Sequence, residues 1–181
     1  MTIRNATLAV LAAAAIAAPS AWAEEKPKAV VNGNGAWRPR PSEGRAGFAF
    51  GLEWEFPFAG MSGFLNPTLE NPFNGQPLHL DLDLGVRFYP FAPAPRVFFI
   101  GPYLGGGYIN GGIPSGQFGV QAEGRVGVLL GLSLLLADWV FGSVAVGGEY
   151  YNIQNIYRDG TIEQSTENLG TVVRAAIGFA F

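Results

Sequence analysis

The last segment of the chain alternates between apolar side chains and small or polar ones. From Leu169 to Phe181, one row of alternate residues is almost wholly apolar, whereas the other is small and carries Arg174 as its only charge. A period of two predicts a strand with two unlike faces. An arginine that faced lipid near the middle of a membrane would cost roughly 2–4 kcal/mol. The pattern therefore predicts that Arg174 points inward and that the apolar row contacts lipid.

The same alternation recurs in five earlier segments, at residues 46–57, 78–89, 97–109, 118–136 and 139–151. It is clearest in 78–89, where leucines alternate with polar residues. In 97–109 the two faces are hard to distinguish, and Phe98, Ile100 and Leu104 are the favoured outward row. A soluble sheet also alternates, but outward apolar rows on strand after strand favour an all-β, closed, antiparallel up-and-down transmembrane β-barrel.

The expected number of strands is eight, although only six are clear in the sequence. Single-chain bacterial barrels have at least eight strands. The best places for the two others are residues 28–38 and 58–77, although neither shows ten residues of clean alternation.

Six strands that start and end on the periplasmic side put the longer polar segments on one side of the membrane. Residues 58–77, 110–117 and 152–168 are then surface loops, and 90–96 and 137–138 are inner turns. Two aromatic belts follow. The inner one contains Phe48, Phe88, Phe98, Trp139, Phe179 and Phe181, and the outer one contains Trp54, Phe56, Tyr108, Phe118 and Tyr150.

A transmembrane helix competes with this interpretation at residues 126–147, where Asp138 is the only charge. The length suits a helix, but an aspartate near the membrane centre would cost about 2.5–3.5 kcal/mol. A tight turn around Asp138 between two strands is therefore the better interpretation.

The N-terminus indicates export. Residues 1–23 combine Arg4, an apolar run from Ala6 to Ala18 and a small-x-small site at Ala21 to Ala23, as in a secretory signal peptide. We expect residues 24–45, which contain prolines, glycines and basic residues, to form a periplasmic leader before a barrel at 46–181.

The composition excludes several classes of function. A formal net charge of −3 gives no electrostatic reason to bind nucleic acid. The chain has no cysteine, which excludes disulfides and thiolate chemistry. The sequence carries no recognisable motif for a cofactor or a metal.

The C-terminus, with Phe179 and the terminal Phe181, resembles the assembly signature of bacterial outer-membrane proteins. Together with the signal peptide and the alternating strands, it is similar in class to the OmpA/OmpX-type small barrels. The resemblance implies outer-membrane lipid and lipopolysaccharide as surroundings, and the barrel-assembly machinery as a partner during insertion. It also implies a structural anchor, a surface-interaction protein or a lipid-modifying enzyme.

Ionisable side chains on the inward rows are expected to form a polar network, because isolated buried charges are costly. The predicted lumen residues are Glu53, Glu55, His79, Asp81, Asp83, Arg87, Glu123, Arg125, Glu149 and Arg174. A cation-attracting pore and a calcium site at paired carboxylates are alternatives. An eight-stranded interior is filled by side chains, which disfavours an open pore.

His79 is the only histidine and lies at the outer end of its predicted strand. Asp81 could orient it as a base, but acyl transfer also needs a nucleophile. The candidates Ser62, Ser115 and Ser165 are all in predicted loops. A polar rim histidine in a non-enzymatic barrel is the first interpretation. A lipid-A-modifying hydrolase or acyltransferase that uses His79 is the second, and a soluble exported lipid-binding barrel is the third.

Overall fold

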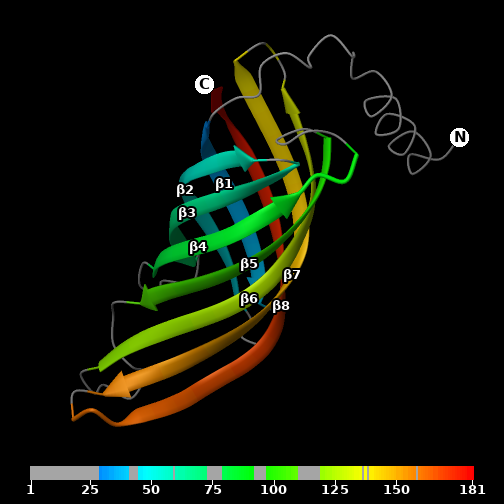
Figure 1. Ribbon diagram of the computed structural model, residues 1–181. Helices are drawn as coiled ribbons and strands as arrows, with labels where there is room; N and C mark the ends of the chain where they lie inside the picture. The colour runs from blue at the N-terminus through cyan, green and yellow to red at the C-terminus, as the bar shows by residue number, and fades with distance from the viewer. Residues whose placement is uncertain are drawn as a thin grey trace, which may run out of the picture.

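The computed structural model describes residues 29–40, 45–58, 60–72, 79–91, 97–109, 119–135, 137, 139–157 and 159–181. The predicted signal peptide lies outside these residues. Eight strands form one closed antiparallel barrel in which each strand pairs with its neighbours in sequence and β8 pairs with β1 (Figure 1). The strands are β1 (Val30–Arg40), β2 (Arg45–Phe58), β3 (Met61–Pro72), β4 (His79–Phe88), β5 (Val97–Ile109), β6 (Gly119–Leu135), β7 (Val140–Tyr157) and β8 (Ile162–Ala180). The predicted fold class is confirmed.

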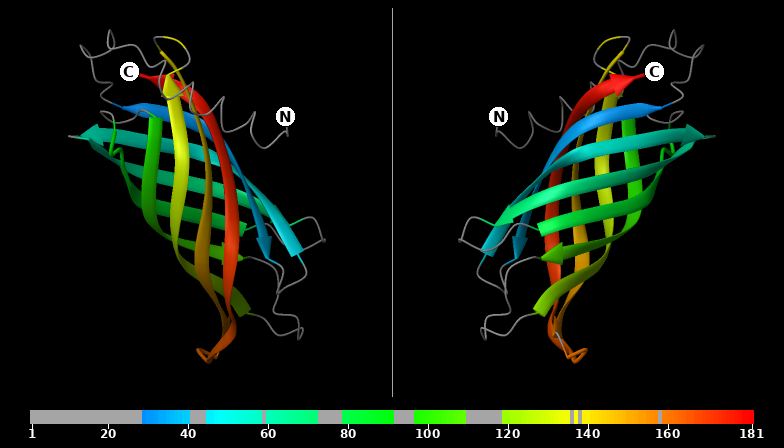
Figure 2. Two further views of the ribbon diagram at one scale, coloured as in Figure 1. Left: turned by 90° about the vertical axis from the view of Figure 1, so that its right-hand side faces the viewer. Right: turned by 90° about the vertical axis from the view of Figure 1, so that its left-hand side faces the viewer.

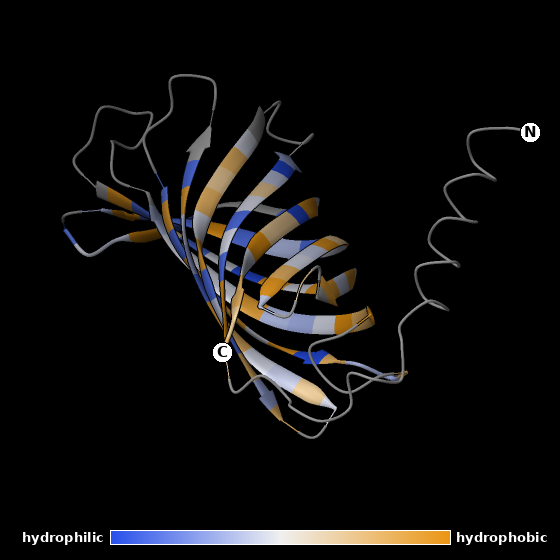
Figure 3. Cartoon of the chain, turned by 90° about the horizontal axis from the view of Figure 1, so that it is seen from above, coloured by the Kyte–Doolittle hydropathy of each residue, from blue (hydrophilic) through white to orange (hydrophobic). Residues whose placement is uncertain are grey.

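The alternation of apolar and polar residues becomes an alternation of exposed and buried side chains. Along β4, Leu80, Leu82 and Leu84 are exposed, whereas His79, Asp81 and Asp83 are buried. On β5, Ile100 and Leu104 are exposed while Phe99 and Tyr103 are buried, which confirms the favoured parity. Figure 3 shows the same alternation as hydrophobic and hydrophilic residues that follow one another along the strands.

The two strands that lack clear alternation are β1 and β3. They lie in the two places predicted for the missing strands, residues 28–38 and 58–77. They also correct two other assignments. Residues 30–40 form β1 and not part of a leader, so the barrel begins before residue 46. Residues 61–72 form β3 and not a surface loop. The outward positions of these strands carry Gly33, Gly35 and Pro67 in place of large apolar side chains, which explains why a search for apolar rows misses them.

The extra strand β1 reverses the predicted direction of β2. We call the end where Ala29 and Phe181 exchange backbone hydrogen bonds the terminal end, and the opposite end the distal end. Trp54 lies opposite Val31, which lies opposite Phe179, whereas Phe48 lies opposite Trp37 near the end of β1. Trp54 and Phe56 are therefore at the terminal end and Phe48 at the distal end, the reverse of the prediction.

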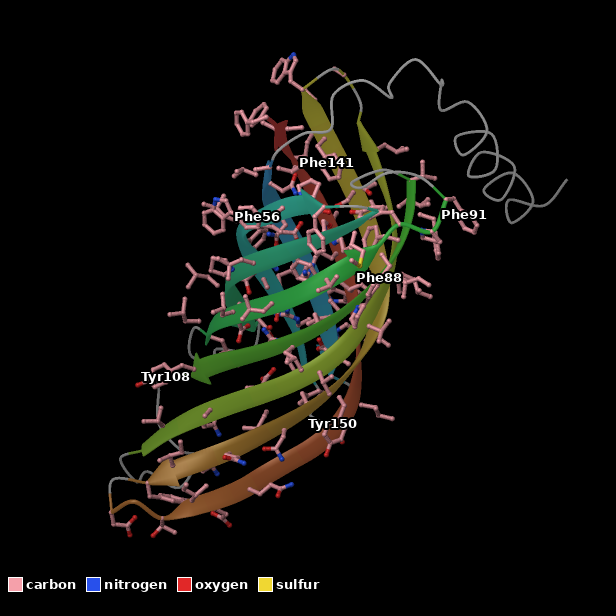
Figure 4. The ribbon with its side chains drawn as sticks, in the orientation of Figure 1. Phe56, Phe88, Phe91, Tyr108, Phe141 and Tyr150 are labelled. Carbon is pink, nitrogen blue, oxygen red and sulfur yellow. The ribbon has the colours of Figure 1, made fainter. Side chains whose placement is uncertain are left out.

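Of the other predicted belt residues, Phe88 and Trp139 lie near the terminal end and Tyr108 and Tyr150 near the distal end, as expected, whereas Phe118 lies outside the described residues. In Figure 4, Phe56, Phe88 and Phe91 lie toward the terminal end, and Tyr108 and Tyr150 lie toward the distal end. Trp139 stacks on Phe179 at the terminal end, with 5.3 Å between ring centroids. The barrel wall thus has an aromatic group near each end.

Strand length is uneven around the barrel. β6, β7 and β8 have 17 to 19 residues, whereas β1 to β4 have 10 to 14. Because of this difference, the β7–β8 hairpin extends beyond the other strands at the distal end (Figure 2). The predicted loop at 152–168 is therefore mostly strand.

Residues 126–147 are part of β6 and β7 and not a transmembrane helix. Ala137 and Val140 exchange backbone hydrogen bonds across the turn between these strands, as the sequence predicts. Within the described residues, no helix is long and apolar enough to cross a membrane.

Candidate functional site: an ion-paired lumen

All ten predicted lumen residues point into the barrel, and each is no more than 5% exposed. They come from five strands, β2, β4, β6, β7 and β8, because each strand turns one row inward. The interior therefore gathers charges that are far apart in the sequence. In contrast to a soluble domain, these charged residues are inside, whereas leucines such as Leu80, Leu82 and Leu84 are outside.

Arg38 on β1 and Glu70 on β3 complete the network, and the sequence analysis misses both. Arg38 is fully buried, and its Nη1 atom donates to Glu70 Oε2 at 3.1 Å. The missed signal is a row of polar residues at alternate positions without a row of large apolar residues on the opposite face. Asn32, Asn34 and Arg38 share one face of β1. A search for polar residues at a period of two would have found this face.

Asp83 is the centre of the network. Its carboxylate accepts hydrogen bonds from Arg38 Nη2 at 3.0 Å, from Arg125 Nε at 3.0 Å and from Arg174 Nη2 at 2.6 Å. These arginines come from β1, β6 and β8, so Asp83 on β4 links strands on different sides of the lumen. Such a network fixes the closed arrangement, because each group loses partners if one strand moves.

Arg87 forms a second cluster nearer the terminal end. Its two terminal nitrogens donate to Glu53 Oε2 at 2.7 Å and to Glu55 Oε2. Glu55 also accepts hydrogen bonds from Ser62 and from the Tyr89 hydroxyl. Two carboxylates, one guanidinium and two hydroxyls are thus connected within the wall.

Aromatic rings fill the space beside the charges. The Arg87 guanidinium lies 4.7 Å from the centre of the Phe64 ring and 4.8 Å from that of Phe99. Tyr103 donates its hydroxyl proton to Glu149 Oε2 at 2.6 Å. A guanidinium over a ring face is favourable when both are desolvated, so these rings contribute to the closure of the lumen.

Two inward glycines on β5 make room for the central carboxylates. A Cβ atom on Gly105 would lie 2.3 Å from Asp83 Oδ1, and one on Gly107 would lie 1.8 Å from Asp81 Oδ1. Neither position tolerates a side chain unless the network moves. The glycine run 105–107 therefore has a packing role that its sequence alone does not reveal.

The structure does not bring His79 together with Ser62, the serine candidate whose side chain it describes. It is buried at the distal end of β4, directly opposite Glu70 on β3. Ser62 lies opposite Arg87, at the other end of β3. Ser115 and the Ser165 side chain are outside the described part of the structure.

The lumen holds an excess of acids. Seven buried carboxylates accompany four arginines; the acids are Glu53, Glu55, Glu70, Asp81, Asp83, Glu123 and Glu149. Among the described residues, no group of three or more histidine, cysteine, aspartate or glutamate side chains has the arrangement of a metal site. The arrangement supports closure of the lumen by ion pairs and hydrogen bonds between side chains of different strands.

Comparison with known proteins does not assign a family. No family model matches the chain, and no curated protein matches it. One solved structure, described as "De novo design of transmembrane beta-barrels", is similar at 14% sequence identity with a TM-score of 0.38. The match covers 87% of this chain and 99% of that chain. A likeness of this degree does not establish a shared function.

Proposed function

We propose that the protein is an integral outer-membrane β-barrel with a structural or surface-interaction role and no enzymatic activity. The observation that carries the proposal is the inversion of burial. Exposed apolar rows cover the outer wall, for example Leu80, Leu82 and Leu84 on β4, while the charged residues are enclosed. Only a hydrocarbon surrounding makes that arrangement favourable over the whole wall.

The inversion also opposes the alternative of a soluble exported lipid-binding barrel. Such a protein keeps its apolar residues inside to hold the lipid and its polar residues outside. Here the fully buried side chains include Arg38, Arg87, Glu53 and Glu55. Charges at these inward positions are unfavourable contacts for an apolar ligand.

The resemblance of the C-terminus to outer-membrane assembly signatures supports the choice of membrane. β8 ends at Ala180, and Phe181 pairs with Ala29, so the signature completes the seam between the first and last strands. Closed barrels have no free edges in the hydrocarbon, which is the condition for a strand protein to span a bilayer.

The location is tested by fractionation of cells that express the full chain. We expect the protein in the outer-membrane fraction, where it should resist extraction by urea. Recovery from the periplasm without detergent would contradict the proposal. As a control, a folded barrel should migrate differently on an unheated and a heated denaturing gel.

The ion-paired lumen predicts that the barrel does not conduct. Arg38, Arg125 and Arg174 reach Asp83 from separate strands and cross the interior. An eight-stranded barrel has little room beyond its side chains. We expect no stable current steps in planar bilayers, and steady conductance of the wild-type protein would contradict closure.

Lipid modification through His79 is tested separately. The His79→Ala variant and the wild type are expressed at equal levels, and lipid A from both is compared by mass spectrometry. We expect the same lipid A profile from both strains and from cells without the protein. A product that requires His79 would show that the barrel is an enzyme.

A further inference from the structure

The ladder between β1 and β8 ends where a proline removes the next hydrogen-bond donor. Ala29 and Phe181 exchange both backbone bonds, and hydrogen-bonded pairs alternate along an antiparallel ladder. Counting by two from this pair reaches Trp37 opposite Val173, which is the last pair in the register. The next bonded position on β1 is Pro39, which has no N–H.

β8 continues well beyond this point. It extends from Val173 back to Ile162 in its pairing with β7, while on its other side the described residues provide no strand. We call residues 162–171 the open edge of β8. Figure 2 shows this part of the β7–β8 hairpin beyond the end of β1.

The backbone groups of the open edge can be assigned to one side or the other. Ala180 donates to the Trp139 carbonyl of the turn before β7, so even-numbered residues from Ala180 to Thr166 face β7. The amides of Thr171, Leu169 and Glu167 therefore face away from β7, toward the side on which the described residues provide no strand. A row of unpaired backbone groups is a template for another strand.

The position of the open edge suits an external partner. Trp37 and Tyr150 are exposed aromatic residues near the distal end, and Tyr150 lies opposite Leu169 on β8. Aromatic residues of barrels concentrate at the two membrane interfaces. Trp37 lies opposite Val173, so on the proposed function residues 162–171 lie outside the hydrocarbon, where an open strand edge is permitted.

The charge of the edge selects the kind of partner. From Ile162 to Thr171 the sequence has two acids, Glu163 and Glu167, and no lysine or arginine. A second copy of the same acidic edge would be repelled, whereas an extended segment with basic side chains would be attracted.

We propose that the open edge of β8 binds an extended, lysine- or arginine-containing segment of another polypeptide by strand addition. The inference rests on the proposed membrane orientation. Backbone hydrogen bonds supply the general affinity in this mode of recognition, and side chains at alternate positions supply the selectivity.

The test uses the full barrel in detergent micelles. The different migration of unheated and heated samples on a denaturing gel (the gel shift) first shows that the barrel is folded. The probe is a short acetylated and amidated peptide that alternates lysine with threonine. We expect amide hydrogen exchange at Glu167, Leu169 and Thr171 to slow about tenfold at a peptide concentration of roughly ten times Kd. Exchange at Asn168 and Gly170, which already face β7, should not change.

A peptide with glutamate in place of each lysine is the matched control, and it should leave all these amides unchanged. Equal protection by both peptides, or no protection by the lysine peptide, would overturn the proposal. Protection that rises with barrel concentration in the absence of peptide would identify a second copy as the occupant and would also overturn it.

Two variants separate the edge from the rest of the barrel. Leu169→Pro removes an edge donor without removing a bond to β7, and it should abolish peptide protection at Thr171 and Glu167. If that variant does not fold, Glu163→Lys combined with Glu167→Lys tests the same site, because it should bind the glutamate peptide in place of the lysine peptide. A barrel that fails the gel shift would argue against the proposed function, whereas a folded barrel that ignores the peptide argues only against the edge.

Discussion

The guanidinium of Arg174 on β8 donates a 2.6 Å hydrogen bond to the carboxylate of Asp83 on β4, although the two residues are 91 positions apart. Their strands are not neighbours in the barrel, so the bond crosses the lumen. The same carboxylate also binds Arg38 and Arg125. One side chain therefore compensates charges from three other strands.

Asp83→Asn should destabilise the barrel strongly. The substitution keeps the shape but leaves three buried arginines without their shared counter-charge, and breaking a buried pair costs about 3–5 kcal/mol. The free energy of unfolding, measured by urea titration of the refolded protein in micelles, should fall by that order. Glu163→Gln is the control, because Glu163 is an exposed acid and its loss should change stability by less than about 1 kcal/mol. Equal effects of the two variants would show that the lumen network does not stabilise the fold.

Gly105→Ala tests the close packing of the central network. The new methyl group would meet Asp83 Oδ1 at 2.3 Å and Arg125 Nε at 2.6 Å, and overpacking of this kind costs about 1–3 kcal/mol. Gly124→Ala on β6 is the matched control, because its methyl group would have no neighbour within 4 Å. Urea titration should separate the two variants, and equal stability would contradict the packing of the lumen.

A pair of neighbouring alanines on β8 tests which face contacts lipid. Ala175 is exposed on the outer wall, whereas Ala176 is 9% exposed and faces the lumen. The chain has no cysteine, so Ala175→Cys and Ala176→Cys each introduce one thiol. A lipid-soluble maleimide should label position 175 in bilayers and leave position 176 unmodified. Labelling of 176 alone would reverse the orientation on which the proposed function depends.

Phe181→Ala should affect assembly more than the stability of the folded barrel. The Phe181 side chain is 70% exposed, while its backbone bonds to Ala29 do not depend on the ring. We expect a lower yield of inserted protein in cells, but a change of about 0.5 kcal/mol or less in the urea titration of refolded protein. A large loss of stability with normal insertion would show that the residue is structural and not an assembly signal.

The tip of the β7–β8 hairpin should respond to acid. The Thr161 amide donates to Asp159 Oδ1 at 2.9 Å, and this bond lowers the pKa of the Asp159 carboxyl below its usual value. Because the folded-state pKa is depressed, the contribution is present above the unfolded pKa and is lost as pH falls through the folded pKa. An NMR titration of the Thr161 amide signal should follow that transition, and Asp159→Asn should remove it. A pH-independent signal in the wild type would contradict the assignment.

Much of the barrel follows from local pattern. On β4 and β8 a period of two with large apolar residues on one face determines both the strand and its orientation, because a shift of one residue would move every side chain to the other face. The ten predicted lumen residues belong to strands with this clear pattern. The sequence analysis misses Arg38 and Glu70 because glycine and proline interrupt the outward rows of β1 and β3.

The sequence by itself determined that strands alternate, that charges share the face opposite the apolar rows, and that the chain ends in a strand with a terminal phenylalanine. These are properties of neighbouring residues, and the covalent chain controls them directly. Tertiary structure decided which residues of the two weakly patterned segments become β1 and β3, that β2 runs opposite to expectation, and that Arg174 reaches Asp83. The length and edge of the β7–β8 hairpin also depend on how the ring closes. Which strands become neighbours depends on the hydrogen bonds of the whole closed sheet, and no single segment contains that information.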